Sequence, residues 1–567
     1  MDPECKERIL SDDYAALIVE NDSDLSIIIN HQDYCMVPIN DAYSVLYTPI
    51  NMLPGNLIQL YGYEIYPNCF GLMDIASFEA SGITRLRAIP SFQLRGGGIL
   101  IGIFDTGVEY THNAFRNADG TTRIHSIWDQ NIQSGTPPEG FHYGTEYLAE
   151  SINEALQNEN PLSIVPSTDE NGHGTMVAGI AAGSVNEQNN FSGVVPDAEL
   201  VVVKLRPASN FIKAHFGIPA EITCYEETDI LMAMNYLNSV SASLNRPISV
   251  CFSLGTFQGS HDERGVISTY VSAMAERIGV AMVIAGGNEG NRGHHYFGEI
   301  PSGQEYDSLE LNVGPDEQSF SMELWGFSPN TYSIDILSPS GEYIPRIPAR
   351  LQESREIRFV FEETVINIDY QIIEERTGDP LIFMRFLRPA PGIWRFRVYA
   401  SVQMAQVYHI WLPIQDFLTS QTTFVTPNND TTLTSPGNTI LPIVVTTYDH
   451  VTGSIYINAG RGYTRNNSIS PDFAAPGVNL TVPTLNNSYG TATGSSLAAA
   501  HTAGVAAMFL EWGLSRGNLL TTVDIRNILI RGARRTPGTV YPNREWGYGI
   551  LDVYGAFESF RGDISNI

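Results

Sequence analysis

The feature that most constrains the fold is a series of short, continuous apolar runs separated by segments with helical periodicity. The apolar runs occupy residues 99–104, 200–205, 248–252 and 280–285, and helical patterns occur at 175–183 and 229–244. Uninterrupted apolar runs of this length are typical of parallel strands that are buried on both faces. Because strands alternate with helices, the sequence predicts an α/β fold with a doubly wound, mostly parallel sheet and helices on both faces.

A different pattern occupies residues 305–425, where polar and apolar residues alternate with a period of two. Turn sequences such as Ser338-Pro339-Ser340-Gly341 separate the alternating segments. Alternation of this kind predicts antiparallel strands with one buried face, so we expect an inserted all-β, jelly-roll-like domain here. The expected division of the chain is 1–73, 74–304, 305–425 and 426–567, with the α/β pattern in the second and fourth parts.

Composition and charge exclude some classes of function. With 43% hydrophobic and 17% charged residues, the 567-residue chain has the composition of a folded globular protein. Its net charge of −30 argues against a nucleic-acid partner, because phosphate binding requires a basic surface. The N-terminus lacks a basic region followed by an apolar core, so we expect cytoplasmic synthesis without a signal peptide. The longest small-apolar stretch is interrupted by His501 and Glu511, so we expect no membrane span.

The cysteines are scattered along the chain, odd in number and without a CxxC pair; they are residues 5, 35, 69, 224 and 251. This distribution favours reduced thiols in an intracellular compartment over a disulfide framework or a zinc site. Nothing in their spacing predicts a disulfide.

Three polar residues stand where catalytic side chains occur in α/β proteins. Asp105, in Asp-Thr-Gly, is at the carboxyl end of the first apolar run. His173 lies in Asn-Gly-His-Gly-Thr, where the glycines allow the backbone to approach closely. Ser496 follows a glycine turn at the start of a small-residue helix, where free backbone N–H groups can stabilise an oxyanion.

Each motif alone has a simpler interpretation. Aspartic proteases also use Asp-Thr-Gly, but they need a second such carboxylate, and the chain has no other Asp-Thr-Gly or Asp-Ser-Gly. A lone His173 is more often structural or a metal ligand, and a serine at a helix start is commonly an N-cap. Asn288, in Ala-Gly-Gly-Asn-Glu-Gly after another apolar run, would alone be a turn asparagine.

Together, the motifs around Asp105, His173, Asn288 and Ser496 resemble the subtilisin-like (S8) serine protease family in type, order and flanking sequence. The resemblance implies a serine endopeptidase with a Ser-His-Asp triad and an oxyanion hole to which Asn288 donates. It also implies an extended edge that binds protein or peptide substrates by strand addition, formed by Ser253, Leu254 and Gly255.

The chain departs from the family pattern in two places. After the nucleophile, the usual proline is replaced by Ala500, which lies away from the reacting atoms. The family's frequent calcium-ligating aspartate aligns with Ala114, so a structural calcium is doubtful. We therefore expect no metal and no other cofactor.

The resemblance further implies that residues 1–73 are an α+β prosegment, which assists folding and binds to the enzyme's own active site. Asp105 lies 31 positions after Asp74, a separation that matches the family's distance between mature N-terminus and catalytic aspartate. The predicted autoprocessing bond is therefore Met73–Asp74, with the residues before it in the substrate channel; the alternative is that this stretch is an ordinary linker strand.

The absent signal peptide, the short prosegment and the β insert resemble the clostridial spore-germination (Csp-type) subtilases. That resemblance implies activation of a cell-wall-lytic zymogen during germination, and association with spores. Some members of that group have lost catalytic residues and act as sensors or scaffolds. A catalytically silent subtilisin-like module therefore stays open as the alternative to an active endopeptidase.

Overall fold

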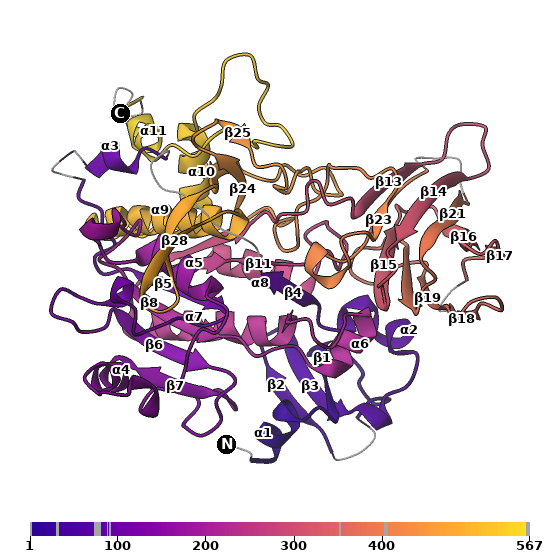
Figure 1. Ribbon diagram of the computed structural model, residues 1–567, viewed down its shortest axis with the longest axis horizontal. Coiled ribbons are helices and arrows are strands. Elements are labelled where there is room, and N and C mark those ends of the chain that lie inside the picture. Colours follow the sequence, from indigo (N-terminus) through magenta and orange to yellow (C-terminus); the bar gives the residue numbers. More distant parts are fainter. Residues whose placement is uncertain are drawn as a thin grey trace.

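The computed structural model describes residues 3–29, 33–72, 81–87, 89, 92–350, 353–401 and 406–562. A nine-stranded sheet lies at its centre, in the order β25-β24-β12-β10-β5-β8-β6-β7, with β26 paired to β24 (Figure 1). The pairs β6–β7 and β24–β25 are antiparallel, and the other pairings in this sheet are parallel. The strands are β5 (Leu100–Asp105), β6 (Ile124–Asp129), β7 (Thr145–Leu148), β8 (Glu199–Lys204), β10 (Ile248–Phe252), β12 (Val280–Ala285), β24 (Ile443–Asp449), β25 (Ser454–Ile455) and β26 (Phe473–Pro476).

Helices cover both faces of this sheet. Alternate strand residues point to opposite sides and are apolar on both, so each face packs against helices. Ile101 and Ile103 join an apolar core with α5 and α9, whereas Leu100 and Phe104 join a second core with α7 and α8. The helices are α3 (Ile83–Arg87), α4 (Ala149–Leu156), α5 (His173–Ala182), α6 (Asn210–Phe216), α7 (Glu227–Leu244), α8 (Val266–Ala275), α9 (Ser495–Ser515), α10 (Thr522–Gly532) and α11 (Val553–Glu558). Short strands outside the sheet are β9 (Tyr225–Glu226), β11 (Leu254–Gly255), β27 (Leu480–Thr484) and β28 (Ser488–Ala492).

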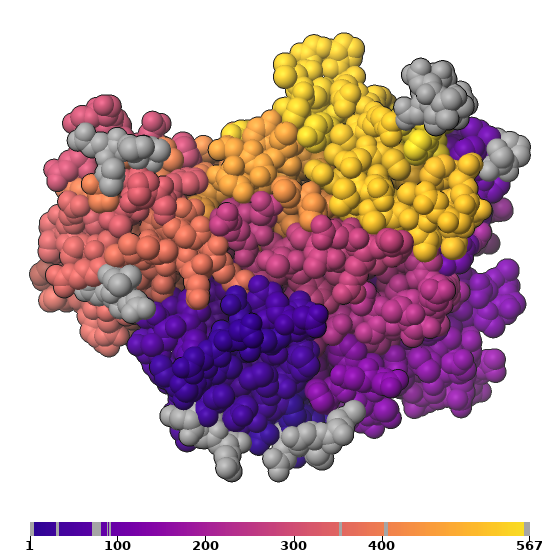
Figure 2. All heavy atoms as spheres, turned by 180° about the vertical axis from the view of Figure 1, so that it is seen from behind, coloured from indigo at the N-terminus to yellow at the C-terminus, as the bar shows by residue number. Residues whose placement is uncertain are grey.

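The N-terminal segment forms a small antiparallel sheet in the order β1-β3-β2. Its elements are α1 (Pro3–Leu10), β1 (Tyr14–Glu20), β2 (Cys35–Pro38), β3 (Tyr43–Pro49), α2 (Leu57–Tyr61) and β4 (Cys69–Leu72). Figure 2 shows this segment (indigo) lying against both the β insert and the α/β part of the molecule.

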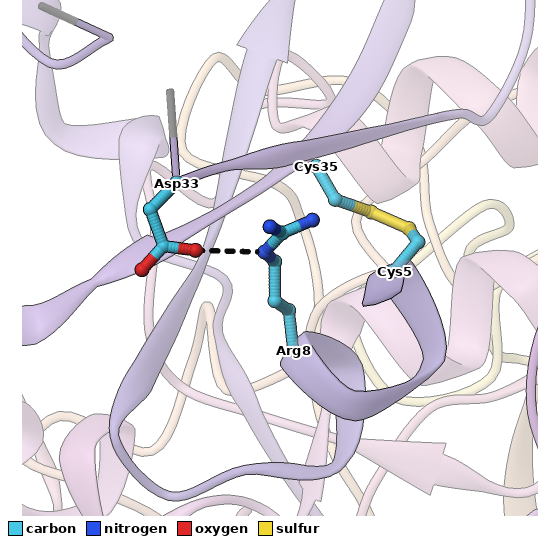
Figure 3. The surroundings of a disulfide bond; sticks show 4 residues. All are labelled: Cys5, Arg8, Asp33 and Cys35. Atoms are coloured by element: carbon cyan, nitrogen blue, oxygen red, sulfur yellow. Dashed lines mark hydrogen bonds and ion pairs between the residues drawn. A yellow bond between two sulfur atoms is a disulfide. The ribbon is translucent and has the colours of Figure 1, made fainter. Parts of the chain in front are cut away.

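The expectation of five reduced cysteines is wrong for two of them. Cys5 of α1 and Cys35 at the start of β2 form a disulfide, with 5.4 Å between their Cα atoms (Figure 3). The packing of α1 beside β2 brings the two together, and this long-range contact has no signature in the cysteine spacing. Cys69, Cys224 and Cys251 are buried free thiols.

The part of the sequence between β12 and β24 forms two antiparallel sheets, with the strand orders β13-β22-β15-β20-β19-β18 and β17-β16-β21-β14-β23. They share one apolar core, which contains Trp394, Phe386 and Leu324. Because β13 belongs to the first sheet, the β region begins before residue 305. The strands are β13 (His295–Glu299), β14 (Asp307–Val313), β15 (Ser319–Trp325), β16 (Tyr332–Leu337), β17 (Tyr343–Ile347), β18 (Glu353–Arg358), β19 (Val365–Gln371), β20 (Leu381–Leu387), β21 (Gly392–Ala400), β22 (Val407–Trp411) and β23 (Thr423–Phe424).

Among the described residues, α9 alone has the length and apolarity of a membrane-spanning helix. Its most apolar window is 83% buried inside the protein, where it contacts β10 and β12. A core helix satisfies the same test of length and composition as a membrane span.

Candidate active site

Three elements far apart in the sequence bring the predicted triad together. Asp105 is the last residue of β5, His173 is the first residue of α5, and Ser496 is the second residue of α9. Nδ1 of His173 lies 2.8 Å and 2.9 Å from the two carboxylate oxygens of Asp105. On the other side of the ring, Nε2 lies 3.0 Å from Oγ of Ser496. The three side chains therefore form one continuous chain of hydrogen bonds.

The Asp105 carboxylate is fully buried and held by further donors. Ser253 donates its hydroxyl at 2.6 Å, and the Thr106 N–H donates at 2.7 Å. Burial acts to raise the pKa of Asp105, but the His173 imidazole, together with these donors, holds that pKa below its usual value. Asp105 is thus kept ionised, as an anion that orients the imidazole must be.

The start of α9 forms the second half of the site. Gly494, with a φ of 150°, precedes the helix in a conformation that favours glycine. The N–H of Ser495 donates to Oδ1 of Asn288 at 3.1 Å, which orients the Asn288 amide so that Nδ2 diverges from that N–H. Nδ2 of Asn288 and the backbone N–H of Ser496 are hence candidate donors to an oxyanion.

Comparison with known families identifies the fold that carries this geometry. The model of the subtilase family of S8 peptidases matches residues 96–311 and 419–549. The chain belongs to the subtilase family. The two matched segments lie on either side of the greater part of the β insert, and the predicted subtilisin-like α/β fold with its mostly parallel sheet is confirmed.

Individual relatives extend the comparison. A subtilisin from Bacillus sp. (strain TA39) is 28% identical over 195 residues, which cover 34% of this subtilase and 35% of the relative. An extracellular basic protease from Dichelobacter nodosus is 36% identical over 97 residues, 16% of each chain. The chain thus spans about a third or less of the length of these two curated relatives.

Among solved structures, the Clostridium perfringens CspB protease is similar over most of its length. The TM-score is 0.75 and the identity 30%, with 85% of this subtilase and 98% of that chain covered. The predicted resemblance to Csp-type subtilases is confirmed.

The strand predicted to bind substrate is paired in this subtilase with its own N-terminal segment. Strand β4 runs antiparallel to β11, with Leu72 opposite Leu254 and Gly71 opposite Gly255. On its other side, β4 pairs with β9. Met73 and Asp74, the predicted processing bond, lie outside the described residues. The last described strand before that bond therefore occupies the edge assigned to substrate.

Phe70 and Ser253 show how this edge is built. The Phe70 side chain is fully buried, and its ring centroid lies 6.1 Å from that of Phe252. Ser253 contacts the predicted triad twice, because its hydroxyl binds Asp105 and its carbonyl oxygen lies 3.3 Å from Oγ of Ser496, where it is a second acceptor for that hydroxyl besides Nε2 of His173. The sequence interpretation assigned Ser253 to substrate binding and missed this contact with the triad.

The guanidinium of Arg123 is buried beside Ala114, the position with which the family's calcium-ligating aspartate aligns. The carbonyl of Ala114 accepts from Nη2 of Arg123 at 2.9 Å, and that of Ala198 accepts from Nη1 at 2.6 Å. Nη2 also donates to the carbonyl of Ala182, and Nε donates to the Ser184 hydroxyl. In the described part of the chain, no cluster of three or more His, Cys, Asp or Glu residues could hold a metal.

Proposed function

We propose that this subtilase is a serine endopeptidase that hydrolyses peptide bonds through an acyl-enzyme. The observation that carries the proposal is the hydrogen-bonded chain from Asp105 through His173 to Ser496. In this arrangement, Nε2 of His173 accepts the hydroxyl proton while Oγ of Ser496 attacks the carbonyl carbon of the substrate. Asp105 keeps Nδ1 of the imidazole oriented and stabilises the charged ring that forms.

The oxyanion that develops is stabilised by Nδ2 of Asn288 and the backbone N–H of Ser496. When the tetrahedral intermediate collapses, His173 returns the proton to the leaving amine, and a water molecule then hydrolyses the acyl-enzyme by the same route. Side-chain and backbone groups carry every step, so the proposed reaction requires no metal or other cofactor.

A fluorophosphonate probe and a peptidase assay on purified protein test the proposal. Wild type should react at Ser496, whereas Ser496→Ala should neither label nor hydrolyse peptides. Asp105→Asn should lower turnover by about 10⁴-fold. Asn288→Ala should cost about 10²–10³-fold, the magnitude known for the corresponding donor of subtilisin. A catalytically silent scaffold or sensor would show no labelling, and near-wild-type hydrolysis by Ser496→Ala would refute the triad.

We also propose that residues 1–73 are a prosegment that the enzyme removes itself by cutting near Met73–Asp74. The support is the pairing of β4 with β11, since a peptide bound along this edge leads its following residues toward Ser496. N-terminal sequencing should find a new end close to Asp74 in wild type and an intact Met1 chain in Ser496→Ala. Identical cleavage of both proteins would assign the cut to another protease.

The similarity to the CspB protease supports a role in spore germination, in which the natural substrate is the zymogen of a cell-wall-lytic enzyme. Synthesis in the cytoplasm followed by association with spores fits this role. Spores that carry Ser496→Ala should accumulate the unprocessed zymogen and germinate slowly. In the same proposal, the β insert supplies stability or partner contacts and no catalytic group.

A further inference from the structure

A carboxylate outside the triad lies where α5 meets the end of β5. Asp169 precedes α5 by four residues, and it is 5% exposed. Its Oδ1 accepts from the hydroxyl of Thr106 at 2.8 Å and from the N–H of Gly172 at 2.7 Å. Its Oδ2 accepts from the N–H and the hydroxyl of Thr175 at 2.9 Å and 2.7 Å. One carboxylate therefore binds the residue after Asp105 and the first turn of the helix that His173 begins.

The end of β5 and the start of α5 are in close contact, so the hydrogen bonds of Asp169 fix the position of one element relative to the other. Thr106 also binds α5 directly, because its hydroxyl oxygen accepts from the N–H of Gly174 at 2.9 Å. A Cβ atom on Gly174 would lie 2.1 Å from the carbonyl oxygen of Gly107, so the helix start and the strand end are in direct contact. Small displacements here change the distance between Asp105 and His173 directly.

The negative charge of Asp169 also affects the protonation of the His173 imidazole. His173 is the first residue of α5, where the aligned peptide dipoles place partial positive charge. Positive charge beside the imidazole opposes its protonation, which the proposed reaction requires. An anion that accepts hydrogen bonds from N–H groups at this helix end offsets that opposition.

We propose that Asp169 is a positioning residue for the triad, which joins the strand end that carries Asp105 to the helix end that carries His173 and neutralises the positive end of α5. The role rests on the proposed peptidase function, but its two consequences can be measured separately. Asp169→Asn keeps the size of the side chain, but in either orientation its NH2 group would face a backbone N–H, that of Thr175 or that of Gly172, so one half of the link is broken and the charge is lost.

The first arm of the test measures peptide hydrolysis. Asp169→Asn should lower kcat by about 10²-fold with KM within about twofold, because the triad and not the substrate edge is displaced. Thr106→Val removes only the strand side of the link and should lower kcat by about tenfold. The control is Asp335→Asn, which removes a buried carboxylate of the β insert that accepts from Tyr399. It should leave kcat unchanged.

The second arm does not depend on hydrolysis. In the Ser496→Ala background, the titration midpoint of the His173 imidazole, followed by NMR, should move to lower pH in Asp169→Asn by about half a pH unit. Asp169→Glu should restore the midpoint and not kcat, because it restores charge without the geometry.

The outcomes separate the two proposals. Folded Asp169→Asn with unchanged kcat and midpoint overturns the role of Asp169, and so does an equal midpoint shift in Asp335→Asn. A wild type that neither hydrolyses peptides nor labels overturns the proposed function, while the NMR arm still decides on Asp169. If Asp169→Asn does not fold, unchanged kcat in Thr106→Val overturns the link.

Discussion

Replacing Arg123 with methionine should destabilise the α/β part of the molecule, because this guanidinium stands among backbone carbonyls as a bound cation would. It is 5% exposed and donates to the carbonyls of Ala114, Ala182 and Ala198. The carbonyl of Ala114 also accepts from the N–H of Ser184, so it keeps a partner when the arginine is removed. The carbonyls of Ala182 and Ala198 would lose a charged donor and stay buried.

The magnitude follows from these two carbonyls. Each buried acceptor left without a partner costs about 1–3 kcal/mol, or about 2–6 kcal/mol together. Part of this is offset, because burial also penalises the guanidinium and lowers the pKa of Arg123 to about 10. We therefore expect a net loss of about 3 kcal/mol. For a cooperative unit of about 350 residues, that corresponds to a decrease in melting temperature of about 4 °C.

Scanning calorimetry in the Ser496→Ala background measures this without self-digestion. The matched control is Arg95→Met, which removes an arginine paired with Asp197 at the surface and should shift the melting temperature by less than about 1 °C. Arg123→Lys should recover only part of the loss, since an ammonium cannot span three carbonyls. Addition of EDTA should leave the melting temperature of the wild-type protein unchanged. A decrease for Arg123→Met no larger than for Arg95→Met would refute the reasoning.

Two further predictions concern pH. Burial and the nearby charge of Glu227 raise the pKa of Glu64 to about 8, opposed by Arg376. Stability from the protonated Glu64 is fully present below about pH 4.5 and is lost progressively as the pH rises to about 8. The processed N-terminal segment should therefore dissociate faster above pH 8, by size-exclusion chromatography, and Glu64→Gln should remove this dependence. Burial lowers the pKa of His261 to about 4, so the unfolded chain takes up a proton that the folded one does not between about pH 6.5 and 4. The melting temperature should fall across that window, and less steeply in His261→Phe.

The central sheet and the convergence of Asp105, His173 and Ser496 could be predicted because their signals are local. A continuous apolar run such as 248–252 has few alternatives to a buried strand, and it forms β10. Asp105 and Ser496 are predicted at a strand end and a helix start. In a doubly wound sheet, strand ends and helix starts lie on the same edge, so the topology itself brings these side chains within reach.

The remaining features depend on which elements become neighbours, and local sequence does not encode that. The disulfide between Cys5 and Cys35 requires α1 to pack beside β2. The bond from Ser253 to Asp105 joins side chains 148 positions apart. Asp169 offered one weak signal, an acidic residue four positions before His173. Its partner Thr106 belongs to the Asp-Thr-Gly motif, but that motif does not indicate which carboxylate the threonine hydroxyl binds, so the pairing could be found only in three dimensions.

The β insert bears on the proposed function through the N-terminal segment that it contacts. Tyr63 donates its hydroxyl to Glu323 of β15 at 2.6 Å, and Gln59 donates to Asp369 of β19 at 2.9 Å. Both carboxylates are buried, and burial raises the pKa of Glu323 to about 7. Departure of the N-terminal segment would remove one donor from each acid, while Glu323 keeps Trp325 and the N–H of Gly259, and Asp369 keeps Arg385. The same departure is needed to free β11 for a substrate. Under the proposed function, access to the active site would therefore require these contacts with the insert to break, although the insert contributes no group to the proposed triad.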